Sequence, residues 1–158
     1  MSSQTSPSKD APSADETEVK ALYRQLLECW NHRDAAAFAA LYEQDGACVG
    51  FDGSQMNGRP EIELVLSQIF AEHQTPPYVG KIREVRFLTS EVTIVRAVAG
   101  MVPPGKSDLD PALNALQSLV ASRREGSWRI ALFQNTPVQF HGRPELVQQV
   151  TDELRQLL

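Results

Sequence analysis

The chain has 158 residues, of which 42% are hydrophobic and 22% charged, and its formal net charge is −5. These values are ordinary for one folded domain with a real core. The acidic balance argues against nucleic acid and against an anionic membrane surface, because both partners need a basic face. No apolar run approaches the ~20 residues that span a bilayer, and the N-terminus lacks the apolar segment of a secretory signal. With two cysteines, Cys29 and Cys48, a reduced cytoplasmic protein is expected.

Apolar residues recur every three or four positions in three segments of the first half of the chain, which predicts three amphipathic helices. Local signals indicate where helices begin: Asp34 is a typical N-cap residue, and Pro60 suits a first helical turn. Pro144 opens a fourth helix in the same way. The expected helices cover residues 15–30, 35–42, 60–73 and 144–157.

From Tyr78 onward the pattern changes to the two-residue period of strands, interrupted by turn residues such as Glu125-Gly126. Long strands are expected over 78–88, 91–102, 113–124 and 128–136, and two short strands before Gly58. This order predicts an α+β fold: a cone-shaped, curved antiparallel sheet packed on three N-terminal helices, with an additional C-terminal helix. The expected division is a disordered leader over 1–14, a cone domain over 15–142 and the last helix over 143–158.

Both side-chain sets of the long strands are largely apolar. One set of the second long strand contains Ile94 and Val98, and the other contains Val95 and Ala97. A sheet with one face in water should alternate cleanly between apolar and polar residues. We therefore expect both faces to be covered, one by the helices and the other by a second copy of the chain, which predicts a homodimer.

Several strings carry a family resemblance. They are Trp30-Asn31-His32-Arg33-Asp34, Phe38-Ala39-Ala40-Leu41-Tyr42, Asp45-Gly46-Ala47 and Gly58-Arg59-Pro60-Glu61-Ile62. They resemble the SnoaL-like domains of the nuclear transport factor 2-like superfamily. The last hairpin, through Phe133-Gln134-Asn135, and the segment Gln139-Phe140-His141-Gly142 resemble the narrower SgcJ/EcaC-type subgroup. Members of that subgroup often accompany polyketide and enediyne gene clusters. The resemblance implies a pocket for a small organic molecule, but one fold hosts many functions.

The strings Glu84-Val85-Arg86 and Ala131-Leu132-Phe133 resemble the ketosteroid isomerase branch of the superfamily. This resemblance implies which side chains face inward, although a slip of one residue would invert every assignment. The implied ligand-binding residues are Tyr42, Ile94, Arg96, Val98, Phe133 and Asn135. The implied residues of the homodimer face are Val95, Trp128, Ile130 and Leu132.

The same resemblance removes the isomerase chemistry from this chain. It places Gly50 where the branch has its catalytic carboxylate and Leu26 where it has a phenol. The branch's second acid falls near residues 119–121, which include no acid. A pocket without these groups cannot run that proton shuttle.

Each remaining candidate side chain has two interpretations. Arg96 either binds a carboxylate or phenolate of the ligand or pairs with Glu84 on the neighbouring strand. Asn135 either donates to an enolate or carbonyl oxygen or satisfies backbone groups at the strand end. The weak catalytic candidates besides Asn135 are Asp52, otherwise a turn residue, and His73, otherwise a complement to a helix dipole.

No metal or cofactor is expected, because the sequence contains no metal-ligand spacing and no glycine-rich dinucleotide fingerprint. The expected function is that of a pocket protein for an aromatic or polyketide-like molecule. Cofactor-independent isomerase, cyclase or dehydratase chemistry in secondary metabolism is one form of it. The alternative is a non-catalytic ligand-binding or dimerisation domain.

Overall fold

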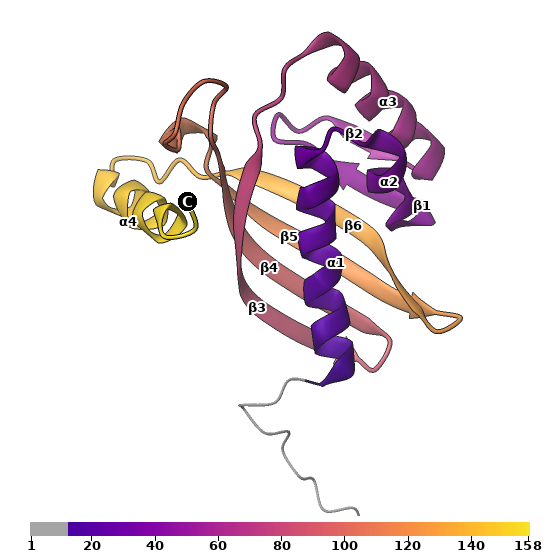
Figure 1. Ribbon diagram of the computed structural model, residues 1–158. Helices are drawn as coiled ribbons and strands as arrows, with labels where there is room; N and C mark the ends of the chain where they lie inside the picture. The colour runs from indigo at the N-terminus through magenta and orange to yellow at the C-terminus, as the bar shows by residue number, and fades with distance from the viewer. Residues whose placement is uncertain (1–12) are drawn as a thin grey trace, which may run out of the picture.

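The computed structural model describes residues 13–158, and in it a curved sheet is crossed on one face by a long helix (Figure 1). The expected leader lies outside the described residues, apart from Ser13 and Ala14. The helices are α1 (Ala14–Asn31), α2 (Ala35–Ala40), α3 (Arg59–Glu72) and α4 (Pro144–Arg155), with a 3₁₀ turn η1 at Pro111–Leu113. The strands are β1 (Tyr42–Val49), β2 (Gln55–Asn57), β3 (Tyr78–Thr89), β4 (Val92–Met101), β5 (Ala115–Arg124) and β6 (Ser127–Pro137).

The six strands form one sheet in the order β2-β1-β6-β5-β4-β3. Neighbouring strands are antiparallel, as expected, except that β1 runs parallel to β6. Helices α1, α2 and α3 lie on one face and α4 lies apart from them (Figure 1). The α+β cone predicted from the order of elements is therefore confirmed, with one parallel pair added.

Capping side chains define the first helices. The Ser13 hydroxyl accepts a hydrogen bond from the backbone N–H of Glu16 at 3.0 Å, and Asp34 accepts one from Ala37 at 3.0 Å. Helix α2 is shorter than predicted, because the chain joins the sheet directly after it: the carbonyl of Leu41 accepts from the N–H of Ile130 at 2.9 Å.

Hydrogen bonds from the string Trp30-Asn31-His32-Arg33-Asp34 join the helices to one another and to the sheet. The indole N–H of Trp30 donates to the Pro76 carbonyl at 2.9 Å, and the Asn31 amide exchanges two hydrogen bonds with the backbone of Tyr78, at 2.7 and 3.0 Å. Arg33, whose φ is 58°, donates to the carbonyls of Phe70 and His73 at the end of α3. These hydrogen bonds therefore hold Trp30 and Tyr78 in place between the helices and the sheet.

A β-bulge at Ala131 changes which side chains of strand β6 face the helices. Ile130 pairs with Ala121, but Leu132 pairs with Val120, so Ala131 is the additional residue. The side chains of Ile130 and Phe133 consequently lie on the same, helix-covered face although three positions separate them. An uninterrupted two-residue alternation would place them on opposite faces.

This register corrects the expected homodimer face. Val95, Trp128 and Ile130 belong to the core against α1 and are 8% exposed or less. They cannot form the outer surface of the sheet. Of the four residues assigned to that surface, Leu132 lies on the outer face, where it pairs with Val120.

Helix α4 covers one end of the outer face. Val150 and Leu154 pack there against Val98 of β4, and the half-buried Leu116 of β5 completes this second cluster. Ion pairs join the same helix to β3: Glu153 lies 2.7 Å from Arg83 and 3.3 Å from Lys81.

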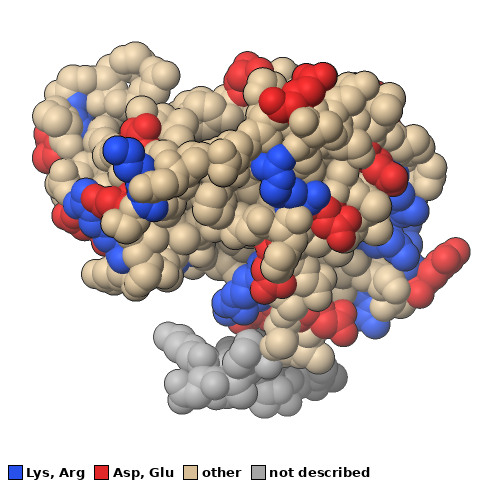
Figure 2. Space-filling model, turned by 45° about the horizontal axis from the view of Figure 1, so that its top comes forward, with Lys and Arg blue, Asp and Glu red and all other residues tan. Residues whose placement is uncertain are grey.

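The surface of the described residues mixes both signs of charge. Figure 2 shows Lys and Arg side chains interspersed with Asp and Glu over one face of the molecule. Among residues 13–158, no helix combines the length and apolar character needed to cross a membrane.

Candidate functional site

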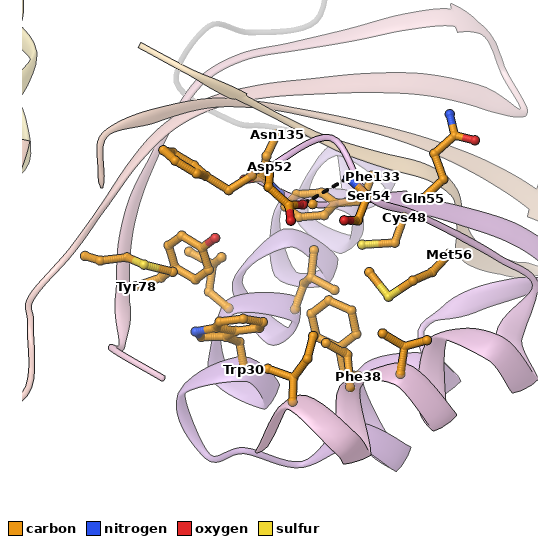
Figure 3. Close-up of a pocket in the computed structure, with 18 residues that line it drawn as sticks. Trp30, Phe38, Cys48, Asp52, Ser54, Gln55, Met56, Tyr78, Phe133 and Asn135 are labelled. Atoms are coloured by element: carbon orange, nitrogen blue, oxygen red, sulfur yellow. Dashed lines mark hydrogen bonds between the residues drawn. The ribbon is translucent and has the colours of Figure 1, made fainter. Parts of the chain in front are cut away.

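A cavity of about 330 Å³ lies between the helices and the concave end of the sheet (Figure 3). Ligand sites in proteins typically enclose about 300–1,000 Å³, so this cavity suits a molecule of one or two rings. Its lining residues are Leu26, Leu27, Trp30, Phe38, Cys48, Gly50, Phe51, Asp52, Ser54, Gln55, Met56, Val65, Leu66, Ile69, Tyr78, Met101, Phe133 and Asn135.

Apolar and aromatic side chains form most of the cavity wall. Helix α3 contributes Val65, Leu66 and Ile69, which the three-and-four spacing places on one helix face. The ring of Trp30 lies 5.4 Å from that of Tyr78. Among the lining residues, all within the described part of the chain, Asp52 is the only one with a formal charge. The wall therefore favours a neutral, mainly apolar guest.

Polar groups gather on one side of the cavity. In Figure 3, Asp52 and Asn135 lie on the same side of the cavity, and Trp30 and Phe38 lie on the opposite side. The amide of Asn135 donates through Nδ2 to the Val49 carbonyl at 3.2 Å and accepts through Oδ1 from Gln117 Nε2 at 2.9 Å. Asn135 is thus fixed in place and is not free to rotate.

Asp52 remains a carboxylate at neutral pH. Hydrogen bonds from Ser54, first from its backbone N–H at 3.0 Å, hold the pKa of Asp52 below its ordinary value. The residue is exposed on the turn after β1. It is available as an acceptor at the rim, but its lowered pKa makes it a weak base.

The hydroxyl of Tyr78 and the thiol of Cys48 stay protonated. Burial raises the pKa of Tyr78 above its ordinary value, and the nearby Cys48 raises it further. Burial also raises the pKa of Cys48 to about 11, and the nearby Tyr42 hydroxyl opposes this shift to a smaller extent. The protonated Tyr78 hydroxyl is therefore able to donate a hydrogen bond but is a poor acid, and Cys48 is not an activated nucleophile.

The sequence model of the SnoaL-like domain matches residues 19–135, a range that includes every residue lining the cavity. This chain belongs to the SnoaL-like domain family. No curated protein matches it.

Solved structures share the fold of this SnoaL-like domain. A domain of unknown function with a cystatin-like fold from Nostoc punctiforme PCC 73102 is 25% identical, with a TM-score of 0.78 over 93% of this chain and 98% of that one. A ketosteroid isomerase-like protein from Erwinia carotovora atroseptica SCRI1043 is 18% identical, with a TM-score of 0.66 over 81% and 99%. An NTF-2 like protein of unknown function from Shewanella oneidensis MR-1 is 16% identical, with a TM-score of 0.65 over 77% and 98%.

The SnoaL-like domain places Phe133 and Asn135 in the cavity wall but three other expected residues outside it. Ile94, Arg96 and Val98 lie on the outer face of β4, because their neighbours Val95 and Ala97 occupy the core. The side chain of Arg96 is 60% exposed and lies 3.9 Å from Glu84. Of the two interpretations of Arg96, the structure therefore has the pairing with Glu84, and Val98 is covered by α4.

Tyr42 and His73 also lie away from the cavity wall. Tyr42 is fully buried beside Phe38 and Cys48, and its hydroxyl has no well-formed hydrogen bond within the described residues. His73 is exposed at the C-cap of α3, where its carbonyl accepts from Arg33. Neither side chain is positioned for chemistry on a guest in the cavity.

Sequence reasoning missed much of the cavity wall. Leu26 and Gly50, which the resemblance to the isomerase branch aligns with its phenol and its carboxylate, do line the cavity. The sequence does not distinguish Tyr78, or Gln117, which contacts Asn135 from behind the wall, because a strand residue gives no sign of which partner its polar group will meet. Within residues 13–158, no three His, Cys, Asp or Glu side chains converge to form a metal site.

Proposed function

We propose that this SnoaL-like domain binds one small, neutral, largely apolar molecule of aromatic or polyketide type. The observation that carries the proposal is the cavity of about 330 Å³ with apolar walls and its few polar groups gathered on one side. This is the usual composition of small-molecule sites. The open cavity also favours a ligand role over a purely dimerising one.

The side chains that line the cavity indicate the charge of the ligand. A carboxylate buried there would meet no cationic side chain among the lining residues and would lie near Asp52. An unpaired buried charge is strongly unfavourable, so a neutral molecule is preferred. The resemblance of the last hairpin to the SgcJ/EcaC-type subgroup supports a polyketide-derived compound, in secondary metabolism, as the natural ligand.

Cofactor-independent acid–base catalysis is the second candidate function. Asp52 and the amide of Asn135 lie on the same side of the cavity, as a base and an oxyanion donor would. An isomerase, cyclase or dehydratase step needs such a pair. The lowered pKa of Asp52 weakens it as a base, which favours binding without turnover as the primary proposal.

The test is calorimetric titration with α-tetralone, a neutral two-ring ketone, on the wild type and two variants of α3. Val65→Phe fills the cavity and should weaken binding by about tenfold or more. Leu64→Phe places the same phenyl ring at the adjacent position, whose side chain is 60% exposed, and should leave the affinity unchanged.

Other outcomes of this titration are equally informative. If neither α-tetralone nor its hydrocarbon analogue tetralin binds, or if both α3 variants bind like the wild type, the cavity is not the ligand site. Asp52→Asn should retain the affinity, because the proposal gives Asp52 no part in holding a neutral guest. A large loss in this variant would contradict a neutral, apolar mode of binding.

A further inference from the structure

A chain of hydrogen bonds crosses the core and ends at the cavity. The hydroxyl of Tyr23 on α1 donates to Gln117 Oε1 at 2.6 Å, Gln117 Nε2 donates to Asn135 Oδ1 at 2.9 Å, and Asn135 Nδ2 donates to the Val49 carbonyl at 3.2 Å. Tyr23 and Gln117 are each 1% exposed, and Asn135 is 8% exposed. Gln117 and Asn135 are direct neighbours across β5 and β6.

The direction of this chain is determined at one end. The Val49 carbonyl only accepts, so Asn135 must turn its nitrogen toward it. Asn135 Oδ1 then faces Gln117, which must donate through Nε2, and the remaining Gln117 oxygen requires a donor from Tyr23. Reversing any one amide would place two acceptors or two donors together in a buried site.

The backbone around Tyr23 is shaped to admit its hydroxyl. A Cβ atom at position 80 would overlap the Tyr23 hydroxyl oxygen and would lie 2.6 Å from Leu27 Cδ1. Only glycine therefore allows β3 to pass this close to the phenol. Burial raises the pKa of Tyr23 well above its ordinary value, which keeps the hydroxyl protonated and able to donate.

We propose that Tyr23 and Gln117 are positioning residues that hold Asn135 with its second amide N–H available to the cavity, so that the ligand carries a carbonyl oxygen there. This inference rests on the proposed binding function and adds a specificity to it. An amide nitrogen has two hydrogens, and the Val49 carbonyl uses one of them. A site built to donate discriminates against analogues that lack the acceptor.

The preference for a ketone is measured as the ratio of the dissociation constants of tetralin and α-tetralone. The two compounds have the same rings, and the ketone alone offers an oxygen acceptor. Asn135→Leu removes the donor and should lower this ratio by about two- to tenfold. Gln117→Met, of similar volume, and Tyr23→Phe should lower it in the same direction by releasing Asn135, while tetralin affinity stays unchanged.

A matched control separates positioning from stability. Thr151→Val removes a buried hydrogen bond to Asn114 at 3.0 Å beneath α4, away from the cavity, and should keep the wild-type ratio. If Asn135→Leu keeps the wild-type ratio, Asn135 is not the hydrogen-bond donor to the ligand. If both Gln117→Met and Tyr23→Phe keep it, these two residues do not position Asn135. If the wild type binds neither compound, the proposed function itself fails. If it binds both without preference, only this inference fails.

Discussion

Two fully buried tyrosines show how little burial alone says about a polar residue. Tyr23 and Tyr42 are 1% and 0% exposed, and burial raises the pKa of both. The Tyr23 hydroxyl donates to Gln117 at 2.6 Å, whereas that of Tyr42 has no well-formed partner within the described residues. A buried hydroxyl without a partner has lost its hydrogen bonds to water and gained none in the protein. The Tyr23 hydroxyl should therefore stabilise the fold and the Tyr42 hydroxyl should destabilise it.

The same substitution at both positions tests this contrast. Tyr23→Phe leaves the Gln117 oxygen without a donor and should lower the free energy of unfolding by about 1–3 kcal/mol. Tyr42→Phe removes a group that satisfies nothing and should leave stability unchanged or raise it. Urea denaturation measures both, and each variant is the volume-matched control of the other. Equal losses would mean that ring packing alone sets the contribution of these residues.

At the scale of elements, the sequence predicted what repeats along the chain and missed what occurs once. The apolar spacing and the turn residues predicted the four α-helices and the strands β3 to β6 of the described residues, because burial of one face imposes a period. The bulge at Ala131 has no such period, and the strand reads as regular across it. A regular alternation across residue 131 places Ile130 and Phe133 on opposite faces of the sheet. It therefore predicts Phe133 in the cavity and Ile130 on the outer surface, whereas both lie on the helix-covered face.

The docking of helix α4 depends on a carboxylate and therefore on pH. The hydrogen bond from Arg83, with further contributions from its charge and from Lys81, lowers the pKa of Glu153 in the folded chain. As the pH falls, Glu153 therefore takes up its proton at a higher pH in the unfolded chain than in the folded chain. The ion pairs contribute their full stabilisation above the ordinary carboxyl pKa and lose it as the pH falls through the lowered value.

The protection factors of the Val150 and Leu154 amides, which correct hydrogen exchange for its intrinsic pH dependence, should accordingly fall below about pH 4 in the wild type. Glu153→Gln should exchange faster than the wild type at neutral pH by a small factor, since exposed ion pairs contribute about 0–1 kcal/mol. It should also lose the part of the acid response that comes from Glu153, while the pair between Asp108 and Arg155 of α4 keeps its own part. Glu145→Gln changes the same charge at the other end of α4, and its acid response should match the wild type. An unchanged acid response in Glu153→Gln would show that the ion pairs of Glu153 do not contribute to the docking of α4.

At the scale of the whole molecule, the outer face of the sheet carries an apolar row that no described element covers. Ala47, Leu132, Val120 and Ile94 are direct cross-strand neighbours on β1, β6, β5 and β4. All four are half-buried, and α4 covers only the adjoining end of this face. The next row contains Gln134, Ser118 and the exposed pair Arg96 and Glu84, so polar residues border the apolar ones.

We propose that a second copy of the chain covers this apolar row. A row that is apolar along its length is self-complementary, as a two-fold symmetric interface requires. Size-exclusion chromatography with light-scattering detection should then give about twice the chain mass of 17.5 kDa. Leu132→Arg places a charge in the middle of the row and should yield the single-chain mass, because an unpaired charge at the centre of an apolar interface is strongly unfavourable.

The control for this variant uses a leucine that the proposed interface does not include. Leu64 on α3 is 60% exposed on the opposite side of the sheet, and Leu64→Arg should leave the dimer intact. Both variants should unfold at the same urea concentration as the wild type at protein concentrations where the dimer has dissociated. A wild type that elutes at the single-chain mass would overturn the homodimer, and a Leu132→Arg variant that remains dimeric would place the interface on another surface.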